Sequence, residues 1–332
     1  MARTLILSLA LLAAWTAQAV AGMVTLVFDD GLRGVHQYAL PILRPLGLPA
    51  VAAVIVERME ADNADYMSVA QVRELQAAGW EIASHGVSHR RITDIPARYA
   101  QETVGAVGAV GAVSGWRADP TALGMVQAYT PHQQVACVLQ GEARLAPEPS
   151  LAQASRRPGS YFFDRITGEL HVNPQVAGAG GEIRLCSYER EMAESRQRLE
   201  ALGLHASSYV VPYNYVNDDV IELGRRYYAR MAAGYDGDGL NRGADPHRIV
   251  RSVVHAGQPA RELVELVERE VRGKDVWLVL CLHDVGSGLG WEPWPAAELK
   301  EFAAWLRGNG VDVVTLAQGA ERMARGQAKG GR

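Results

Sequence analysis

Two adjacent aspartates and two histidines spaced four apart are the residues best suited to chemistry in this sequence. Asp29 and Asp30 directly follow one short apolar run, and His85 and His89 directly follow another. Alone, the aspartates fit a turn or a helix cap, and the histidines fit a solvated helix face. Neighbouring carboxylates repel unless a cation or proton lies near them. Imidazoles at i and i+4 project from one side of a helical turn. Together, Asp30, His85 and His89 form the His, His and carboxylate ligand set of a metal site with open positions.

Two later apolar runs also end in polar groups. His283 ends the run Trp277–His283 and is a candidate general acid or base, although a hydrogen-bonded structural histidine is the alternative. Pro212 and Tyr213 follow the run Ser207–Val211. The backbone N–H of Tyr213 is therefore a candidate donor to an oxyanion.

Parallel strands would bring these residues together, because their carboxyl ends meet at one rim. Short apolar runs predict strands at Met23–Phe28, Ala50–Val56, Glu81–Ser84, Ser207–Val211, Arg248–Val253, Trp277–His283 and Val311–Thr315. Helical patterns lie between them at Ser68–Ala78, Ile95–Val110, Tyr188–Leu202, Asp218–Arg230, Ala260–Arg272 and Ala296–Arg307. This alternation predicts an α/β fold, either an open sheet or a barrel.

The alternation breaks between about Trp116 and Cys186, where proline and glycine are frequent. Short strands are predicted there at Gln134–Leu139, Gly159–Phe163, Glu169–Val172 and Glu182–Leu185, with a hairpin turn at Asp164–Gly168. We therefore expect a small β-rich insertion at 116–187 within an α/β domain that spans 22–325. Residues 326–332 are expected to form a flexible tail.

The amino-terminal segment 1–21 has the pattern of a signal peptide. Arg3 precedes the apolar run Leu5–Ala14, and small residues then alternate up to Ala21. An uncleaved membrane anchor is the alternative. No later segment has 18 consecutive apolar residues, so we expect an exported protein, periplasmic or secreted, with no membrane span after cleavage. In such a compartment Cys137 and Cys186 could form a disulfide.

The composition excludes one class of partner. Hydrophobic residues make up 48% of the chain, charged residues 21%, and the formal net charge is −4. Acidic and basic residues are interspersed, so no basic face or tail predicts a nucleic acid partner. The oligomeric state is not indicated by the sequence.

The motifs together resemble the polysaccharide deacetylases, the NodB-homology group of carbohydrate esterases. Four segments carry the resemblance. Val27-Phe28-Asp29-Asp30-Gly31 is similar to the family's Thr-Phe-Asp-Asp-Gly motif, and the segment Ser84–His89 is similar to its His-(Ser/Thr)-x-x-His motif. Val211-Pro212-Tyr213 is similar to its Arg-x-Pro-Tyr motif, and Leu282-His283 is similar to its Leu-x-His-type motif. The resemblance covers Met23 to about Thr315 outside the insertion. It implies a distorted (β/α) barrel.

The resemblance also implies a role for each of these residues: metal ligands Asp30, His85 and His89, general base Asp29, general acid His283, acetyl-pocket residue Leu282 and oxyanion donor Tyr213. The implied cofactor is one divalent ion such as Zn²⁺. The implied activity is removal of N-acetyl groups from an amino-sugar polysaccharide or oligosaccharide. Aromatic residues are candidate platforms for a sugar ring, although each alone also fits a core or an ordinary surface position: Tyr66, Trp116, Tyr161, Trp291 and Trp294.

The sequence departs from the family pattern at Val27, which replaces the threonine of the first motif, and in three further respects. Gly86 replaces a hydroxyl residue that usually stabilises the loop in this family. Val210 replaces an arginine that usually pairs with the general base, here Asp29. Arg251 or Arg248 could compensate for the missing arginine. The fourth motif of the family is not evident, and Asp236 is the nearest candidate for a carboxylate that orients His283.

Two other functions remain open at the level of sequence. One is hydrolysis of an amide or imide in a smaller, non-carbohydrate substrate. The other is a carbohydrate-binding protein that has lost turnover, which the absence of an arginine at Val210 favours. A complete set of base, acid and ligands opposes this second alternative, because a binding module needs neither a base nor an acid.

Overall fold

The computed structural model describes residues 22–90, 103–104, 117–120, 124–129, 138–141, 143–164, 166–175, 183–185, 188–233, 238–243 and 245–330. Its strands are β1 (Met23–Phe28), β2 (Val51–Val54), β3 (Glu81–Ser84), β4 (Thr103–Val104), β5 (Arg117–Ala118), β6 (Val126–Tyr129), β7 (Val138–Gln140), β8 (Ala143–Arg144), β9 (Ala146–Pro147), β10 (Ser160–Asp164), β11 (Glu169–Asn173), β12 (Ile183–Leu185), β13 (Ser208–Val210), β14 (Arg230–Ala232), β15 (Leu240–Asn241), β16 (Ser252–Val253), β17 (Trp277–Leu282) and β18 (Asp312–Val313). Its helices are η1 (Val35–Ala39), α1 (Leu40–Leu43), η2 (Arg44–Leu46), α2 (Val56–Glu60), α3 (Val69–Ala77), α4 (Leu151–Ala154), α5 (Tyr188–Ala201), η4 (Pro212–Asn214), α6 (Asp218–Tyr227), α7 (Ala260–Glu270), α8 (Ala296–Gly308) and α9 (Leu316–Gly330).

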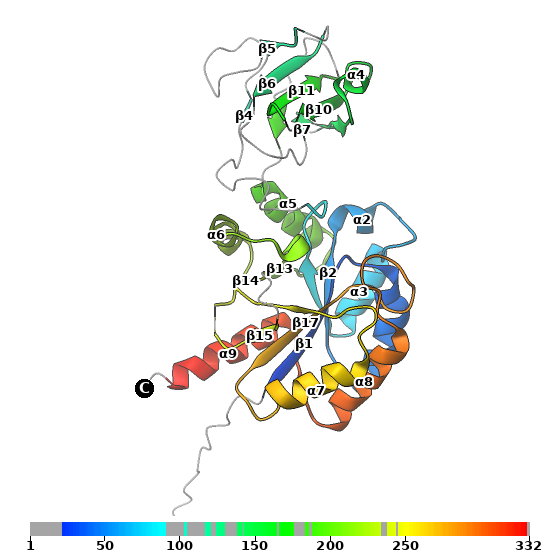
Figure 1. Ribbon diagram of the computed structural model, residues 1–332, viewed down its shortest axis with the longest axis vertical. Coiled ribbons are helices and arrows are strands. Elements are labelled where there is room, and N and C mark those ends of the chain that lie inside the picture. The colour runs from blue at the N-terminus through cyan, green and yellow to red at the C-terminus, as the bar shows by residue number, and fades with distance from the viewer. Residues whose placement is uncertain are drawn as a thin grey trace, which may run out of the picture.

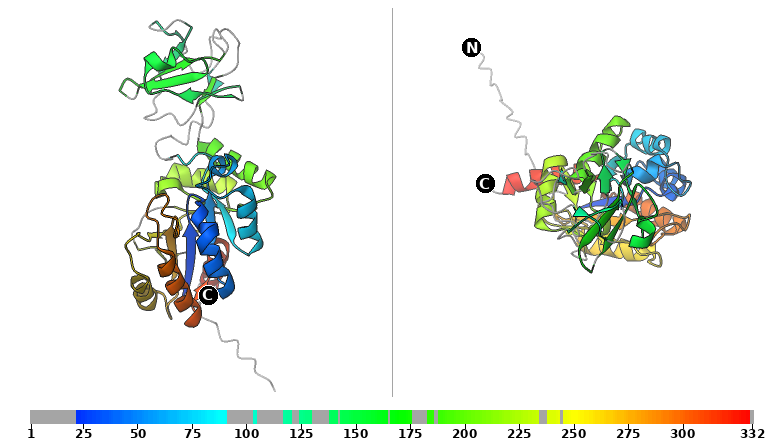
Figure 2. Two further views of the ribbon diagram at one scale, coloured as in Figure 1. Left: turned by 90° about the vertical axis from the view of Figure 1, so that its right-hand side faces the viewer. Right: turned by 90° about the horizontal axis from the view of Figure 1, so that it is seen from above.

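One nine-stranded sheet forms the body of the protein. Its path is β14-β13-β3-β2-β1-β17-β15, with β16 also paired to β17 and β18 to β1. The pairings along it are parallel except that of β15 with β17. The sheet curls, and α1, α3, α7 and α8 cover its outer side (Figures 1 and 2). This is the distorted (β/α) barrel that the sequence predicts.

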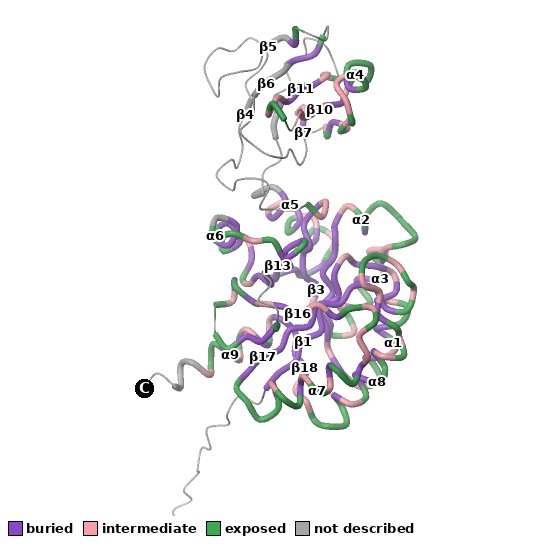
Figure 3. The backbone as a smooth tube through the Cα atoms, in the orientation of Figure 1, coloured by how far each residue is buried: buried purple, intermediate pink, exposed green. Residues whose placement is uncertain are grey.

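Side chains alternate between the two faces of the sheet. In β1, Val24, Leu26 and Phe28 pack into the core beneath the outer helices, whereas Met23 and Val27 pack into a second core on the inner face. All six residues of β1 are buried, as expected of a central parallel strand (Figure 3). The residue that follows a strand at the rim can therefore continue the series of side chains that point to the inner face.

The insertion contains two small sheets. One has the order β5-β6-β11-β10-β9 and the other β4-β12-β7-β8. The predicted hairpin joins β10 and β11 antiparallel, and the N–H of Gly168 donates to the carbonyl of Asp164 at 2.8 Å. In Figure 1 these sheets lie beyond α5, at one end of the molecule.

Several predicted elements differ from the structure. The helix predicted at Ile95–Val110 is wrong at Thr103–Val104, because these two residues form β4 and pair with β12 of the insertion. The helix predicted to reach Arg230 ends at Tyr227, since Arg230 begins β14. The tail predicted from 326 is helical to Gly330.

Some predictions fall outside the described residues. These are the signal peptide at 1–21, the Cys137 and Cys186 pair, and Asp236. Among the helices that the structure describes, none combines the length and apolar character needed to cross a membrane.

Candidate metal centre

The predicted site residues converge on one cavity of about 380 Å³ at the carboxyl ends of the parallel strands. Its lining includes six residues that the sequence singles out: Asp29, Asp30, His85, His89, Tyr213 and His283. They follow β1, β3, β13 and β17, so that residues more than 250 positions apart in the chain share one rim.

Asp30, His85 and His89 form a group with the composition of a metal site. Oδ1 of Asp30 lies 3.5 Å from Nε2 of His85 and 3.2 Å from Nε2 of His89. The three ligand atoms all lie within 4.8 Å of one another. Oδ1 of Asp30 is buried and has no hydrogen-bond partner in the described structure. A buried oxygen without a partner, facing two imidazole nitrogens, fits a divalent cation.

The backbone orients one of these imidazoles. Nδ1 of His85 lies 2.7 Å from the carbonyl oxygen of Val210 in β13. A carbonyl can only accept, so Nδ1 carries a proton and Nε2, which faces Asp30, is the nitrogen that could bind a metal. The position where the family has an arginine thus contributes its main chain to the site.

The charges of the group also favour a cation. Burial raises the pKa of Asp30, but His85 and His89 outweigh it and lower this pKa to about 2. Burial, with the neighbouring His85, lowers the pKa of His89 to about 4. Burial lowers the pKa of His85, yet Asp29 and Asp30 more than offset it and leave that pKa raised. At neutral pH the site therefore holds ionised carboxylates around a point that attracts positive charge.

Arg251 supplies the cation that the sequence lacks at Val210. Its Nη1 donates to both carboxylate oxygens of Asp29, at 2.8 Å each, and its Nε donates to Oδ1 of Asn214 at 3.1 Å. Arg251 is only 1% exposed, so this ion pair is buried. Burial raises the pKa of Asp29, but Arg251 is the largest of the influences that leave it lowered. Arg248, the other candidate, instead pairs with Asp218 at the surface.

The predicted role of Leu282 in the acetyl pocket is wrong. Because side chains alternate along β17, Cys281 and His283 face the cavity while Leu282 packs into the core beneath the outer helices. Sγ of Cys281 lies 3.5 Å from Oδ2 of Asp29. The position two residues before His283 is thus the one that lines the cavity, and strand periodicity alone would have identified Cys281.

Asp29, Cys281 and His283 form a second group whose ligand atoms lie within 4.8 Å of one another. Arg251 already neutralises Asp29 there. Burial lowers the pKa of His283 and raises that of Cys281 well above its ordinary value. The only carboxylate of this group is thus paired with Arg251, so the group has less negative charge to attract a cation than the group around Asp30.

Strained backbone is concentrated at this cavity. Asp30, His89, Tyr213 and Asn214 have φ values of 71°, 56°, 59° and 56°, in the left-handed region that L-residues rarely adopt. All four line the cavity. Such conformations cost free energy and persist where the surrounding structure imposes them, most often at functional sites.

Two aromatic rings flank the opening of the cavity. The ring of Tyr213 lies 4.5 Å from that of His89, and the ring of Trp291 meets His283 edge-on at 5.0 Å. Trp291 is 51% exposed. Its loop is held by Asp284, whose Oδ2 accepts from the N–H and Oγ of Ser287 at 3.1 and 2.6 Å.

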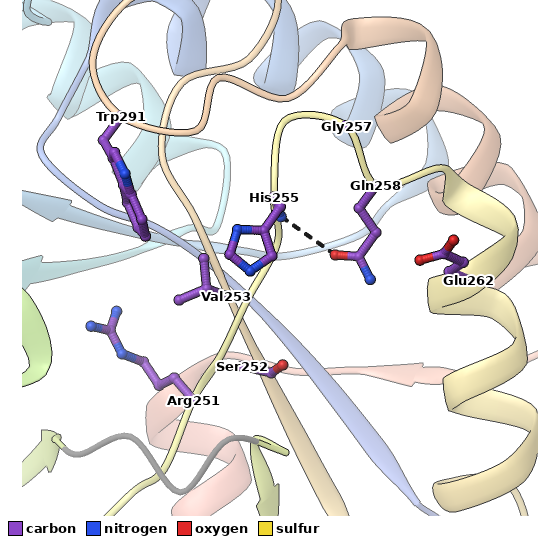
Figure 4. Close-up of a pocket in the computed structure, with 8 residues that line it drawn as sticks. All are labelled: Arg251, Ser252, Val253, His255, Gly257, Gln258, Glu262 and Trp291. Atoms are coloured by element: carbon purple, nitrogen blue, oxygen red, sulfur yellow. Dashed lines mark hydrogen bonds between the residues drawn. The ribbon is translucent and has the colours of Figure 1, made fainter.

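A second, more open cavity of about 650 Å³ adjoins the first. The two share Arg251 and Trp291, and the second is also lined by His255, Gln258 and Glu262 (Figure 4). The described residues that line either cavity all belong to the barrel and none to the insertion.

Residues 17–116 match the family model for polysaccharide deacetylase. No curated protein matches the sequence. Solved structures with a similar fold include a family 4 carbohydrate esterase from Streptomyces lividans in complex with acetate, at 16% identity and a TM-score of 0.44 over 88% of this chain and 91% of that chain. The peptidoglycan deacetylase PdaC from Bacillus subtilis has 14% identity and a TM-score of 0.48 over 94% and 96%. A CE4 family pseudoenzyme from Bacillus anthracis has 10% identity and a TM-score of 0.46 over 91% and 66%.

At these identities and TM-scores the solved structures carry no inference about activity. The matched segment contains the first two motifs, with Asp29, Asp30, His85 and His89. The remaining two motifs lie outside it, and the fold brings His283 and Tyr213 to the same cavity. Over residues 17–116 the chain is therefore similar to the polysaccharide deacetylases, the NodB-homology type of carbohydrate esterase.

Proposed function

We propose that this protein is a metal-dependent hydrolase that removes N-acetyl groups from an amino-sugar oligosaccharide or polysaccharide. The observation that supports the proposal is one cavity lined by two carboxylates and three imidazoles, to which we assign a cation site and two proton-transfer groups. Asp30, His85 and His89 form the cation site, and Asp29 and His283 are the proton-transfer groups.

A divalent cation held by Asp30, His85 and His89, which we take to be Zn²⁺ from its preference for imidazole and carboxylate ligands, would polarise the amide carbonyl and lower the pKa of the attacking water. Asp29 would accept a proton from that water as it adds to the carbonyl carbon. Arg251 keeps Asp29 ionised for this step. His283 would give a proton to the amine nitrogen as the C–N bond breaks, so that acetate and the free amine are released. The backbone N–H of Tyr213 would donate to the oxyanion.

The buried Asp29 and Arg251 pair bears on the alternative of lost turnover. The absence of an arginine at Val210 favours that alternative at the level of sequence. In the structure Arg251 reaches the same carboxylate from the segment before β16, so the base has its cation. We therefore favour an active enzyme.

Removal of the metal tests the proposal. We expect the purified protein to contain about one divalent ion per chain and to release acetate from N-acetylglucosamine oligomers. A chelator should abolish that release and Zn²⁺ should restore it, because the backbone N–H of Tyr213 can donate to the oxyanion but cannot lower the pKa of the attacking water. Metal content by elemental analysis and acetate by an enzyme-coupled assay are the measurements. Acetate release that survives complete removal of metal would contradict the mechanism, and release only from small imides would favour the alternative substrate class.

The second cavity predicts a preference for oligomers over the single sugar. Trp291 forms a wall common to both cavities, and its exposed ring is suited to stack on a neighbouring sugar. We expect Trp291→Ala to lower kcat/KM for oligomers about tenfold, equivalent to about 1.4 kcal/mol, and to change kcat/KM for N-acetylglucosamine much less. Trp291→Phe, which keeps an aromatic face, should retain most of the preference. An equal loss on the single sugar and on oligomers would contradict this subsite.

A further inference from the structure

The segment between the two histidine ligands is held by a residue from a distant helix. We propose that Glu191 of α5 is a positioning residue for the candidate metal centre, because its carboxylate fixes the conformation of His85–His89 and thereby sets the affinity for metal. The inference rests on the proposed metal site but does not require the proposed substrate.

Glu191 directs all of its described hydrogen bonds to this segment. Its Oε2 accepts from the N–H groups of Val87 and Ser88 at 2.8 and 3.0 Å, and its Oε1 accepts from Oγ of Ser88 at 2.7 Å. Glu191 is only 5% exposed. A buried carboxylate is unfavourable unless it accepts hydrogen bonds, and bonds to an ionised acceptor are stronger than those between neutral groups. The folded state therefore links the burial of Glu191 to one conformation of this segment.

The start of the segment is attached to the same helix. Oγ of Ser84 donates to Oγ of Ser195 in α5 at 2.8 Å and accepts from the N–H of Gly86 at 3.2 Å. The hydroxyl of Ser195 also lies 2.8 Å from that of Tyr228, and both groups contact the carbonyl of Met192. Helix α5 thus holds the segment next to His85 and again next to His89.

The carbonyl groups of the segment are fixed by α2. Those of Gly86 and Val87 accept from the N–H groups of Val56 and Glu57 at 3.2 and 3.0 Å. With N–H groups bound to Glu191 and carbonyls bound to α2, the backbone has little freedom to place His89 elsewhere. This constraint agrees with the positive φ of 56° at His89.

Gly86 and Glu191 form a matched pair. Gly86 has φ of +82°, and a Cβ atom built there would lie 3.2 Å from Oη of Tyr209 and 3.3 Å from Oε2 of Glu191. A side chain at this position would therefore crowd the carboxylate. Position 86 thus has no hydroxyl side chain to stabilise the loop. The carboxylate of Glu191, from helix α5, stabilises it instead.

The test measures metal affinity in four purified proteins: wild type, Glu191→Ala, Glu191→Gln and Glu194→Gln. Glu194 lies one turn further along α5 and pairs with Arg198 outside the site, so its variant is the matched control. Zn²⁺ affinity is measured by competition with a chelating dye, and ligand geometry by the visible absorption of the Co²⁺ protein. Thermal unfolding of the metal-free proteins shows that each is folded.

We expect Glu191→Ala to weaken Zn²⁺ binding on the order of 10–100-fold, the usual effect of removing a group that orients a metal ligand. Its Co²⁺ spectrum should also change. Glu191→Gln, which keeps one acceptor oxygen, should weaken binding less, and Glu194→Gln should match wild type. If Glu191→Ala does not fold, Glu191→Gln carries the test, because it keeps the size of the side chain.

Wild-type affinity and an unchanged Co²⁺ spectrum in the folded Glu191 variants would overturn this inference. A wild-type protein that binds no divalent metal would overturn both the inference and the proposed mechanism. A protein that binds metal in the predicted order of affinities but releases no acetate would support the role of Glu191 and overturn only the proposed activity.

Discussion

Replacing Asp29 by asparagine should lower kcat for acetate release on the order of 10²–10⁴-fold while leaving the metal bound. The factor is that expected when a general base is lost. Asparagine cannot accept the proton from the attacking water, whereas Asp30, His85 and His89 are untouched. Measurements of kcat and of metal content in the same preparation check the two halves of this expectation.

Two controls separate chemistry from folding in this variant. Asp62→Asn changes an exposed carboxylate after α2 and should have no effect on kcat. Thermal unfolding reports the stability of Asp29→Asn, which should fall because Arg251 loses its buried counter-charge. A folded Asp29→Asn protein with near wild-type kcat would exclude Asp29 as the base. Loss of metal from the variant would instead indicate that Asp29 is a ligand.

The metal ligands are the part of the site that local sequence could predict. Asp30 is the second residue after β1, and His85 directly follows β3, so each lies where a parallel strand brings polar groups to the rim. His89 lies in the same loop as His85. Alternation of strands and helices is a local signal that predicts an α/β fold with these residues at one rim, whereas the choice of a barrel over an open sheet depends on the resemblance of the motifs to a family.

The groups that support the ligands could not be predicted in the same way. Arg251 is 222 positions from Asp29, and Glu191 is 104 positions from Val87. No spacing rule connects such pairs, because only the curvature of the sheet and the packing of α5 bring them together. From the sequence, either Arg251 or Arg248 could pair with Asp29. The structure shows that the side chain of Arg251 points into the barrel and that of Arg248 lies at the surface.

The error at Leu282 had a different origin. The motif was aligned one position away, and the resulting role conflicts with the alternation of side chains along β17. Cys281 lies on the same face of the strand as His283, whereas Leu282 lies on the opposite face. The two-residue period of a strand therefore assigns the position that faces the cavity to Cys281 and not to Leu282.

Helix α9 shows how tertiary contact can override a local signal. The sequence analysis expects a flexible tail from residue 326, and glycine, which lies within this helix at Gly319, has a low helix propensity. In the structure, a Cβ atom at position 319 would lie 2.4 Å from the ring of Trp277. Glycine therefore permits the helix to approach the inner core closely, and packing compensates for its low helix propensity.

The second large effect is expected from Arg251→Met. This change leaves the buried Asp29 carboxylate without its cation, and it should lower the free energy of unfolding by about 3–5 kcal/mol, as for other broken buried ion pairs. Chemical denaturation of the metal-free proteins at neutral pH measures the difference. Arg248→Met, which removes exposed ion pairs with Asp218 and Asp245, should leave the free energy of unfolding nearly unchanged and is the matched control.

The decrease in the free energy of unfolding caused by Arg251→Met should depend on pH in a defined direction. Burial raises the pKa of Asp29 and Arg251 lowers it, with a net lowering in the wild type. A carboxyl with a lowered pKa stabilises the folded state above its unfolded pKa, and this contribution is lost as the pH falls through the folded value. In the variant the lowering influence of Arg251 is absent, while burial still raises the pKa of Asp29. The Asp29 carboxyl therefore accepts a proton at a higher pH than in the wild type. The difference in stability should therefore be largest near neutrality and narrow as the pH falls towards about 4.

The double variant Asp29→Asn with Arg251→Met separates the structural role of this pair from its catalytic role. With both charges removed, neither group is left buried and uncompensated, so the loss of stability should be smaller than the sum of the two single losses. A coupling on the order of 1–3 kcal/mol is expected for residues in direct contact. Acetate release should nevertheless stay as low as in Asp29→Asn, because restored stability does not restore a base. Additive losses of stability would show that the ion pair is not formed, and recovered activity would show that Asp29 serves the fold alone.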